Sequence, residues 1–171
     1  QSGEGVCMSL LMAQAGMMQS PSGGGHIAWR VRVTANNGYT GAQFTTISFR
    51  ESSGGADLTT PSGATTRAFA TSHHTIYVPA QAFDGDNSTV WFTSDNVPQA
   101  IGYKFPAPVE VGAVALLPVP TGSVLSIAPK DFSIQFSDDT TTGIDGTWTT
   151  AWSVSGETGW AFDEMRVYSK P

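Results

Sequence analysis

Apolar and polar residues alternate along most of the chain after His26. The pattern is clearest at residues 29–34, 101–106 and 132–137, where large apolar side chains occupy every second position. A period of two indicates β-strands that bury one face and expose the other. We therefore expect the apolar set of each segment to face a common core.

Two segments nearer the C-terminus continue this pattern. Trp148 and Trp152 fall on one parity, and so do Met165 and Val167. The alternation predicts that each pair points into the core, and core packing is also the better interpretation of Trp91.

Turn-forming residues separate the apolar runs. Asn-Gly stands at 37–38, and Asp-Gly stands at 84–85 and at 145–146. The segment 109–119 is nearly all apolar, as expected for a strand that is buried on both faces. Many short strands at this spacing, with no convincing amphipathic helix after residue 25, predict an all-β antiparallel sandwich.

Composition and length agree with this class. Charged residues make up only 13% of the chain, about half the usual share, while β-branched and aromatic residues are plentiful. These values argue against an all-α fold or a doubly wound α/β fold. A chain of 171 residues suits one domain, which can bury a core without disulfides. The single cysteine, Cys7, excludes an intrachain disulfide and a thiolate zinc site, and it reads best as a small buried apolar residue.

The charge balance excludes two kinds of partner. With 8 basic and 14 acidic residues the formal charge is −6, and no basic stripe is present. Nucleic acids and anionic membranes both bind mainly through positive charge. We therefore expect neither of them as a partner.

The first 25 residues differ from the rest of the chain. Four of the five methionines lie there, and a Pro-Ser-Gly-Gly-Gly linker closes the segment at 21–25. The apolar run 6–18 is shorter than the ~20 residues that a membrane-spanning helix needs. The chain begins at Gln1, so we read it as a processed product or as a piece of something longer. We divide it into an N-terminal apolar arm with its linker (1–25) and one domain (26–171). The arm either packs on its own or a neighbouring chain or is partly disordered.

An ordered set of motifs after the linker resembles a known family. The motifs are WRVRVTANNG (29–38), AFDGDNSTVWFTS (82–94), IGYKFPAPVEVGAVAL (101–116), APKDFSIQFSDD (128–139), GTWTT (146–150) and FDEMRVYS (162–169). Together they resemble the discoidin family, also called the coagulation-factor type C domain, among the galactose-binding-like jelly rolls. The opening at 29–38 further resembles versions found in bacteriophage tail and other virion proteins.

This resemblance implies a fold and a class of function. It implies an eight-stranded antiparallel jelly roll with both termini at one end and variable loops at the other. Members are mostly non-catalytic binders of sugars, lipid head groups or proteins, and the fold alone does not choose among these ligands. No catalytic signature such as G-x-S-x-G, H-E-x-x-H or a P-loop occurs in the sequence.

The resemblance also implies a structural calcium ion in the loop before Trp91. Calcium takes ~6–8 oxygen ligands in flexible geometry. Two alternatives stay open, because Asp84-Gly85 is also an ordinary turn and Glu164 can form a salt bridge with Arg166. The ligands carried over from the family are the Gln81 carbonyl, the Asp84 and Asp86 carboxylates, the Thr89 hydroxyl, the Asp163 carbonyl and the Glu164 carboxylate.

A sugar site is the second candidate. An aromatic plane such as Tyr77 or Trp160 suits the apolar face of a sugar ring, and planar polar groups suit its hydroxyls. The alternative is that the histidines are merely exposed and that Trp160 anchors a loop or plugs the barrel. The candidate ligand residues are His73, His74, Arg67, Asp95, Asn96 and Trp160.

Three functions are compatible with the sequence. The first is a glycan- or surface-binding module on a phage tail tip or fibre. The second is an architectural virion component whose loops and N-terminal arm bind neighbouring subunits in an oligomeric assembly. The third is a carbohydrate-binding accessory domain of a secreted bacterial enzyme. We expect a non-enzymatic virion module, located on the virion or outside the cell, that mediates adhesion or assembly.

Overall fold

The computed structural model describes residues 24–171, so Cys7 and almost all of the expected N-terminal arm lie outside the described residues. The described part is 41% strand and 9% helix, which confirms the all-β class. The strands are β1 (His26–Asn36), β2 (Ala42–Phe44), β3 (Thr46–Arg50), β4 (Ala68–Ala70), β5 (Trp91–Thr93), β6 (Gln99–Val109), β7 (Ala113–Leu117), β8 (Pro129–Ser137), β9 (Thr149–Val154) and β10 (Arg166–Ser169). The helical turns are η1 (Pro61–Gly63), α1 (Ala64–Arg67), η2 (Pro79–Ala82) and η3 (Leu125–Ile127). Within these residues no helix is long and apolar enough to span a bilayer.

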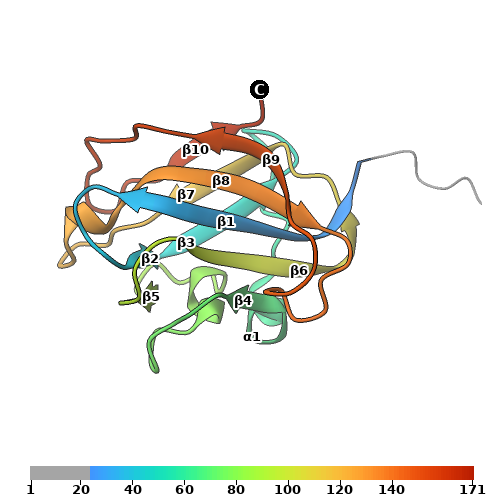
Figure 1. The fold of residues 1–171 in the computed structure, drawn as a ribbon, viewed down its shortest axis with the longest axis horizontal. Coiled ribbons are helices and arrows are strands. Elements are labelled where there is room, and N and C mark those ends of the chain that lie inside the picture. Colours follow the sequence, from blue (N-terminus) through green and yellow to red (C-terminus); the bar gives the residue numbers. More distant parts are fainter. Residues whose placement is uncertain (1–23) are drawn as a thin grey trace, which may run out of the picture.

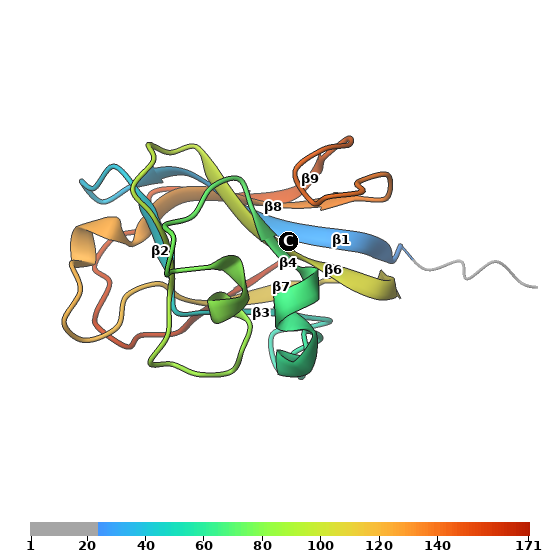
Figure 2. The same ribbon diagram turned by 90° about the horizontal axis from the view of Figure 1, so that it is seen from below.

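The strands form two facing layers, as Figures 1 and 2 show. One layer is a five-stranded sheet in the order β4-β6-β1-β8-β9, and the other is a three-stranded sheet in the order β10-β7-β3. The short strands β2 and β5 pair only with each other. The described residues thus hold ten strands where eight were expected, because the β2–β5 pair adds two strands to the eight of the main sheets.

The core fills the space between the sheets. Trp29, Ile101 and Ile134 enter it from the five-stranded sheet, and Phe49 and Leu116 enter it from the three-stranded sheet. All five side chains are buried, and every residue of β7 is buried as well. The expectations for segments 29–34, 101–106 and 132–137 are confirmed. Of segment 109–119 only Ala113–Leu117 forms the buried strand, since Val109 ends β6 and Glu110 is exposed.

A bulge corrects the prediction for Trp148 and Trp152. Ile134 pairs with Trp152 and its neighbour Gln135 pairs with Thr150, so Ala151 is an extra residue in β9. One extra residue switches the parity of a strand. Trp152 therefore enters the core, whereas Trp148 packs on the outer face of the sheet against Phe69 at 5.7 Å between ring centroids.

The prediction that Met165 and Val167 point into the core is also wrong. Val167 and Met165 are exposed, while Tyr168 points inward and packs against Phe132. The apolar side chains face solvent here because β10 is an edge strand, and Arg166 and Tyr168 occupy its inner positions in a polar network with Glu157.

The two ends of the sandwich differ. Figure 1 shows the start of β1 at one end of the molecule, and it shows the loops β1–β2 and β7–β8 at the opposite end. We call this second end the loop end. The β1–β2 loop is fastened there by the backbone N–H of Tyr39, which donates to the carbonyl of Ser126 at 3.1 Å.

Candidate functional site

A groove of about 460 Å³ opens at the loop end. We call it the loop-end groove. Aromatic rings of Tyr39, Tyr77 and Phe92 and hydroxyls of Ser88, Thr121 and Ser123 line much of it. The remaining lining residues are Gln43, Val90, Pro120, Gly122, Val124 and Ile127.

Backbone hydrogen bonds hold the Tyr77 ring in place. The N–H of Tyr77 donates to the carbonyl of His74 at 3.0 Å, which closes a turn. That turn is fixed to β5, because the His74 N–H donates to the Phe92 carbonyl at 2.8 Å and the Phe92 N–H donates to the Tyr77 carbonyl at 3.3 Å. The Tyr77 ring stands edge-to-face against Phe92 at 6.0 Å and keeps 36% of its surface exposed. Tyr77 thus offers a rigid, half-open aromatic surface.

Gln43 ties the groove to the β7–β8 loop. Its amide Nε2 donates to the carbonyl of Pro118 at 3.1 Å, and its Oε1 accepts a hydrogen bond from the Ser123 hydroxyl at 3.2 Å. Gln43 is buried, so both bonds are shielded from water. The loop that carries Thr121 and Val124 is therefore positioned against the small sheet formed by β2 and β5.

The proposed sugar contacts are only partly gathered by the fold. His74 packs beside Tyr77 at 5.4 Å between ring centroids, as a shared site would require. His73 is exposed, and its Nδ1 lies 3.0 Å from the carbonyl of His74. Neither histidine belongs to the groove lining in the described part of the chain.

The remaining loop candidates lie elsewhere. Arg67 ends α1, and the backbone of Asp95 and Asn96 is held by neighbours in its own turn. The Asp95 N–H donates to the Thr93 hydroxyl, and the Asn96 carbonyl accepts from the Gln99 amide. Arg67, Asp95 and Asn96 are absent from the loop-end groove lining among residues 24–171.

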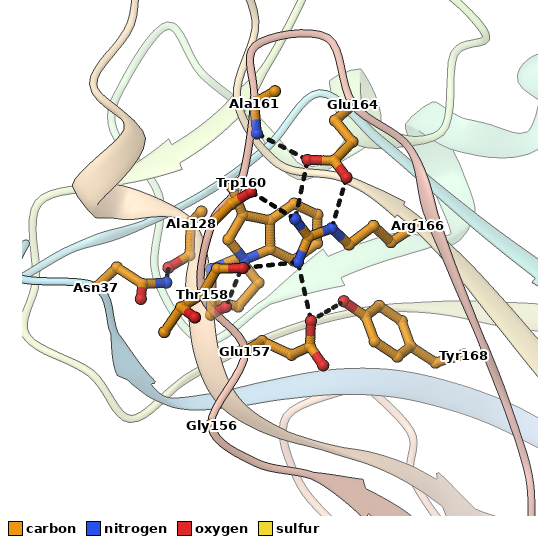
Figure 3. A network of polar contacts seen from close by, with 12 residues as sticks. Asn37, Ala128, Gly156, Glu157, Thr158, Trp160, Ala161, Glu164, Arg166 and Tyr168 are labelled. Carbon is orange, nitrogen blue, oxygen red and sulfur yellow. Dashed lines mark hydrogen bonds and ion pairs between the residues drawn. The ribbon is translucent and has the colours of Figure 1, made fainter.

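Trp160 is an anchor of its loop, and the expected stacking on a sugar is corrected here. Only 6% of Trp160 is exposed, and its indole N–H donates to the carbonyl of Pro129 at 3.0 Å. The guanidinium carbon of Arg166 lies 4.1 Å from the Trp160 ring centroid and covers one face of the ring. Figure 3 shows this stack inside a network of polar contacts.

Arg166 uses every N–H that its guanidinium carries. Its Nε and Nη2 donate to Glu164 at 2.8 and 3.0 Å, and its Nη1 donates to Glu157 at 3.0 Å. Nη1 and Nη2 also donate to the carbonyls of Thr158 and Gly159. The hydrogen bonds that Arg166 donates to Glu164 raise the pKa of Arg166 and lower the pKa of Glu164. Burial, followed by the bond to Glu157, raises the pKa of Tyr168.

The loop before Trp91 assembles several of the expected calcium ligands. The Thr89 hydroxyl lies 2.8 Å from Asp84 Oδ2, 3.0 Å from the Asp86 carbonyl and 3.3 Å from the Gln81 carbonyl. A hydroxyl has one proton, so it cannot donate fully to three acceptors. The side-chain Oε1 of Gln81 is buried and has no hydrogen-bond partner among the described residues. This oxygen-rich cluster fits a hard divalent cation.

The other expected calcium ligands have different partners. The Asp86 carboxylate accepts from Ser88. Asp163 was expected to offer its carbonyl, and its carboxylate accepts from the N–H and hydroxyl of Thr121. Glu164 is engaged by Arg166, as the alternative interpretation of the sequence had it. In the described residues no group of three or more His, Cys, Asp or Glu side chains is arranged to hold a metal ion. The loop half of the set therefore fits a cation, and the strand half does not fit in this arrangement.

Several groove residues were not singled out from the sequence. Tyr39 carried a usable signal, because it is an aromatic residue that directly follows an Asn-Gly turn. Gln43 and Thr121 carried none, since a polar residue within a strand or beside Pro-Thr-Gly is ordinary there.

One comparison with known proteins finds a match. The family model described as the F5/8 type C domain matches residues 64–164, which is more than half of the chain. The matched segment runs from α1 to the residue before Met165, so it includes the Thr89 loop and most of the loop-end groove. Neither the search of curated proteins nor the search of solved structures found a match.

Proposed function

The chain belongs to the F5/8 type C domain family, and from this premise we propose that it is a non-catalytic module that binds glycans in the loop-end groove. Family membership makes the chain a ligand-binding module in general terms. The choice of glycan rests on the lining of the groove. Exposed aromatic faces stand beside hydroxyl groups there, and this combination matches the apolar face and the hydroxyls of a sugar.

The observation that carries the proposal is the fixed, half-exposed ring of Tyr77 against Phe92. A ring that the backbone already holds in place loses little entropy when a sugar stacks on it. Ser88, Thr121 and Ser123 surround the same volume. Each donates its hydroxyl proton within the protein, so the three oxygens offer acceptors for the sugar hydroxyls.

A glycan array carrying host surface polysaccharides and galactosides tests this proposal. We expect binding to at least one glycan class, and we expect Tyr77→Ala to lose it. Binding by Tyr77→Ala at wild-type level would move the site away from this groove. Absence of binding across the array would overturn the glycan proposal.

Exposed apolar side chains favour a second candidate, in which the loop end contacts a neighbouring protein subunit. Ile76 is 63% exposed and Val124 is 49% exposed, and both lie in the loops that flank or line the groove. Apolar surface of this kind gains ~25 cal/mol per Å² when a partner covers it. Sedimentation of the full chain, compared with Ile76→Ser and Val124→Ser, distinguishes a self-assembling surface from a glycan site.

We further propose that the module is displayed on a virion, with host polysaccharide or virion subunits as its partners. The resemblance of residues 29–38 to virion proteins supports this location, and an accessory domain of a secreted bacterial enzyme is the alternative. Deletion of residues 1–25 followed by measurement of oligomer size tests the arm, because an unchanged assembly would exclude arm exchange. The neighbouring gene sequences separate virion from enzyme.

Calcium is proposed as a structural cofactor of the Thr89 loop. The Gln81 and Asp86 carbonyls, the Asp84 carboxylate and the Thr89 hydroxyl would hold it. The ion would neutralise the carboxylate and cross-link the loop. Asp163 would contribute its backbone carbonyl, and ligation by Glu164 would require its carboxylate to leave Arg166.

A further inference from the structure

The outer face of the five-stranded sheet carries cations without counter-ions. Arg30 and Arg32 lie two residues apart on β1, so they share this face and stand about 7 Å apart along the strand. Two of the eight Lys and Arg residues of this acidic chain thus lie side by side on one face. Among residues 24–171 no carboxylate oxygen lies within 4.0 Å of either guanidinium.

Arg30 is held in place by uncharged groups. Its Nε donates to Gln135 Oε1 at 2.8 Å, and its guanidinium carbon lies 3.9 Å from the Trp148 ring centroid. Burial, followed by the nearby charge of Arg32, lowers the pKa of Arg30 to about 10. Two like charges, one of them partly desolvated, favour the approach of an anion.

Arg32 is the open member of the pair. Its side chain makes no hydrogen bond within the described part of the chain and lines a groove of about 330 Å³ across β1, β8 and β9. We call this the outer-face groove. Most of its other polar groups are hydroxyls, supplied by Thr34, Ser133, Thr150 and Ser153.

One carboxylate also lines the outer-face groove. Asp131 Oδ1 accepts a hydrogen bond from the Gly156 N–H at 2.8 Å, so this carboxylate is directed to the β9–β10 loop. It lies farther than 4.0 Å from the Arg32 guanidinium. The nearby Lys104 is also engaged, because its Nζ donates to the carbonyls of Thr140 and Thr141. Arg32 and the free Nη groups of Arg30 are therefore the donors available to an anion.

We propose that the outer-face groove is a second ligand site, specific for the carboxylate of an acidic saccharide. The carboxylate lies against Arg32 in the groove, and the hydroxyl side chains bind the sugar ring. Arg30 does not line the groove; it is bonded to the lining residue Gln135 and adds positive charge beside it. A saccharide fits better than an acidic peptide, since hydroxyl side chains from three neighbouring strands line the groove and match the hydroxyls of a sugar. The outer-face groove shares no residue with the loop-end groove, so this site goes beyond the proposed function.

Titration calorimetry with trigalacturonate tests this site on the full chain. The fully methyl-esterified trisaccharide is the matched neutral probe, and hexaglutamate is the acidic peptide probe. We expect trigalacturonate to bind and to weaken when NaCl rises from about 50 to 500 mM. We expect the ester to bind at least tenfold more weakly.

Variants locate the binding. Arg32→Gln removes a side chain that holds nothing in the fold, so the protein folds and loses at least tenfold in affinity for trigalacturonate. The charge-matched control is Lys170→Gln, which follows β10 on the other sheet and is expected to bind normally. Tyr77→Ala is also expected to bind normally, so failure at the loop end and failure here are distinguishable.

Four results would overturn the proposal. These are no binding of trigalacturonate at low salt, equal binding of the ester, equal losses in Arg32→Gln and Lys170→Gln, and tighter binding of hexaglutamate than of trigalacturonate. The last result would assign the groove to an acidic peptide partner.

Discussion

Arg166 lies flat over Trp160, with 4.1 Å between the guanidinium carbon and the ring centroid, while the edges of the same guanidinium are bonded to Glu157 and Glu164. This one contact fixes the loop between β9 and β10, as Figure 3 shows. It also removes Trp160 from the surface and engages Glu164. Arg166 therefore occupies both Trp160, which the sequence suggested as a sugar contact, and Glu164, which it suggested as a calcium ligand.

Arg166→Lys is expected to destabilise the domain by about 1–3 kcal/mol, because a lysine keeps the charge and loses the planar fork and the stack. Urea unfolding measures the change. Arg50→Lys is the control, since the Arg50 Nε donates only to Ser48 and its loss costs less. Equal midpoints for the two variants would contradict the role of the network.

Tyr77→Ala is expected to weaken glycan binding about tenfold or more, because it removes the fixed aromatic face of the loop-end groove. The thermal midpoint should change little, since the ring is half exposed. Ile144→Ala removes an exposed apolar side chain from the β8–β9 hairpin and serves as control. A wild-type dissociation constant for Tyr77→Ala would exclude the ring as a contact.

Calcium at millimolar concentration is expected to raise the melting temperature relative to EDTA, because an ion that binds only the folded state stabilises it by mass action. The gain is about 2.7 kcal/mol at a hundredfold excess over the dissociation constant. Asp84→Asn is expected to abolish the shift, and Asp95→Asn, in another loop, to retain it. Scanning calorimetry in both buffers measures the melting temperatures, and identical wild-type curves would overturn the proposal of a structural calcium ion.

Asp145 makes the β8–β9 hairpin sensitive to acid. Its carboxylate accepts hydrogen bonds from the hydroxyls of Thr140, Thr141 and Thr142 and from the N–H groups of Thr141 and Thr142, and these bonds hold its pKa well below the usual range. A lowered pKa in the folded state means that the contribution is complete above the unfolded pKa of about 3.9 and is lost as pH falls toward the folded value.

Asp145→Asn is therefore expected to flatten the decline of stability between about pH 5 and pH 2. Urea unfolding at several pH values measures the slope, and Asp95→Asn controls for loss of one charge. A mutant slope as steep as that of the wild type would show that the hairpin does not depend on this carboxylate.

The sequence predicted the class of fold because burial of one face imposes a period of two on the apolar residues of β1, β6 and β8. It predicted the core positions Trp29, Ile101 and Ile134 for the same reason. It failed for Trp148 and Val167, because periodicity does not register a one-residue bulge or show which side of an edge strand is covered. The extra residue Ala151 places Trp148 on the outer face of the sheet, although the local alternation of apolar and polar residues is unchanged.

The candidate sites divide in the same way. Asp84 and Thr89 are close in the chain, so short-range turn geometry brings their side-chain oxygens together as the sequence predicted, whereas Asp86 presents its carbonyl to Thr89 and its carboxylate to Ser88. The loop-end groove joins Tyr39, Tyr77 and Thr121, which are far apart in sequence. The pairing of Arg166 with Glu164 likewise could not be told from the sequence, which left calcium ligation by Glu164 equally open. Alternation, turns and local loops follow from neighbouring residues, whereas contacts across the sandwich follow from register and packing, and only the folded chain decides those.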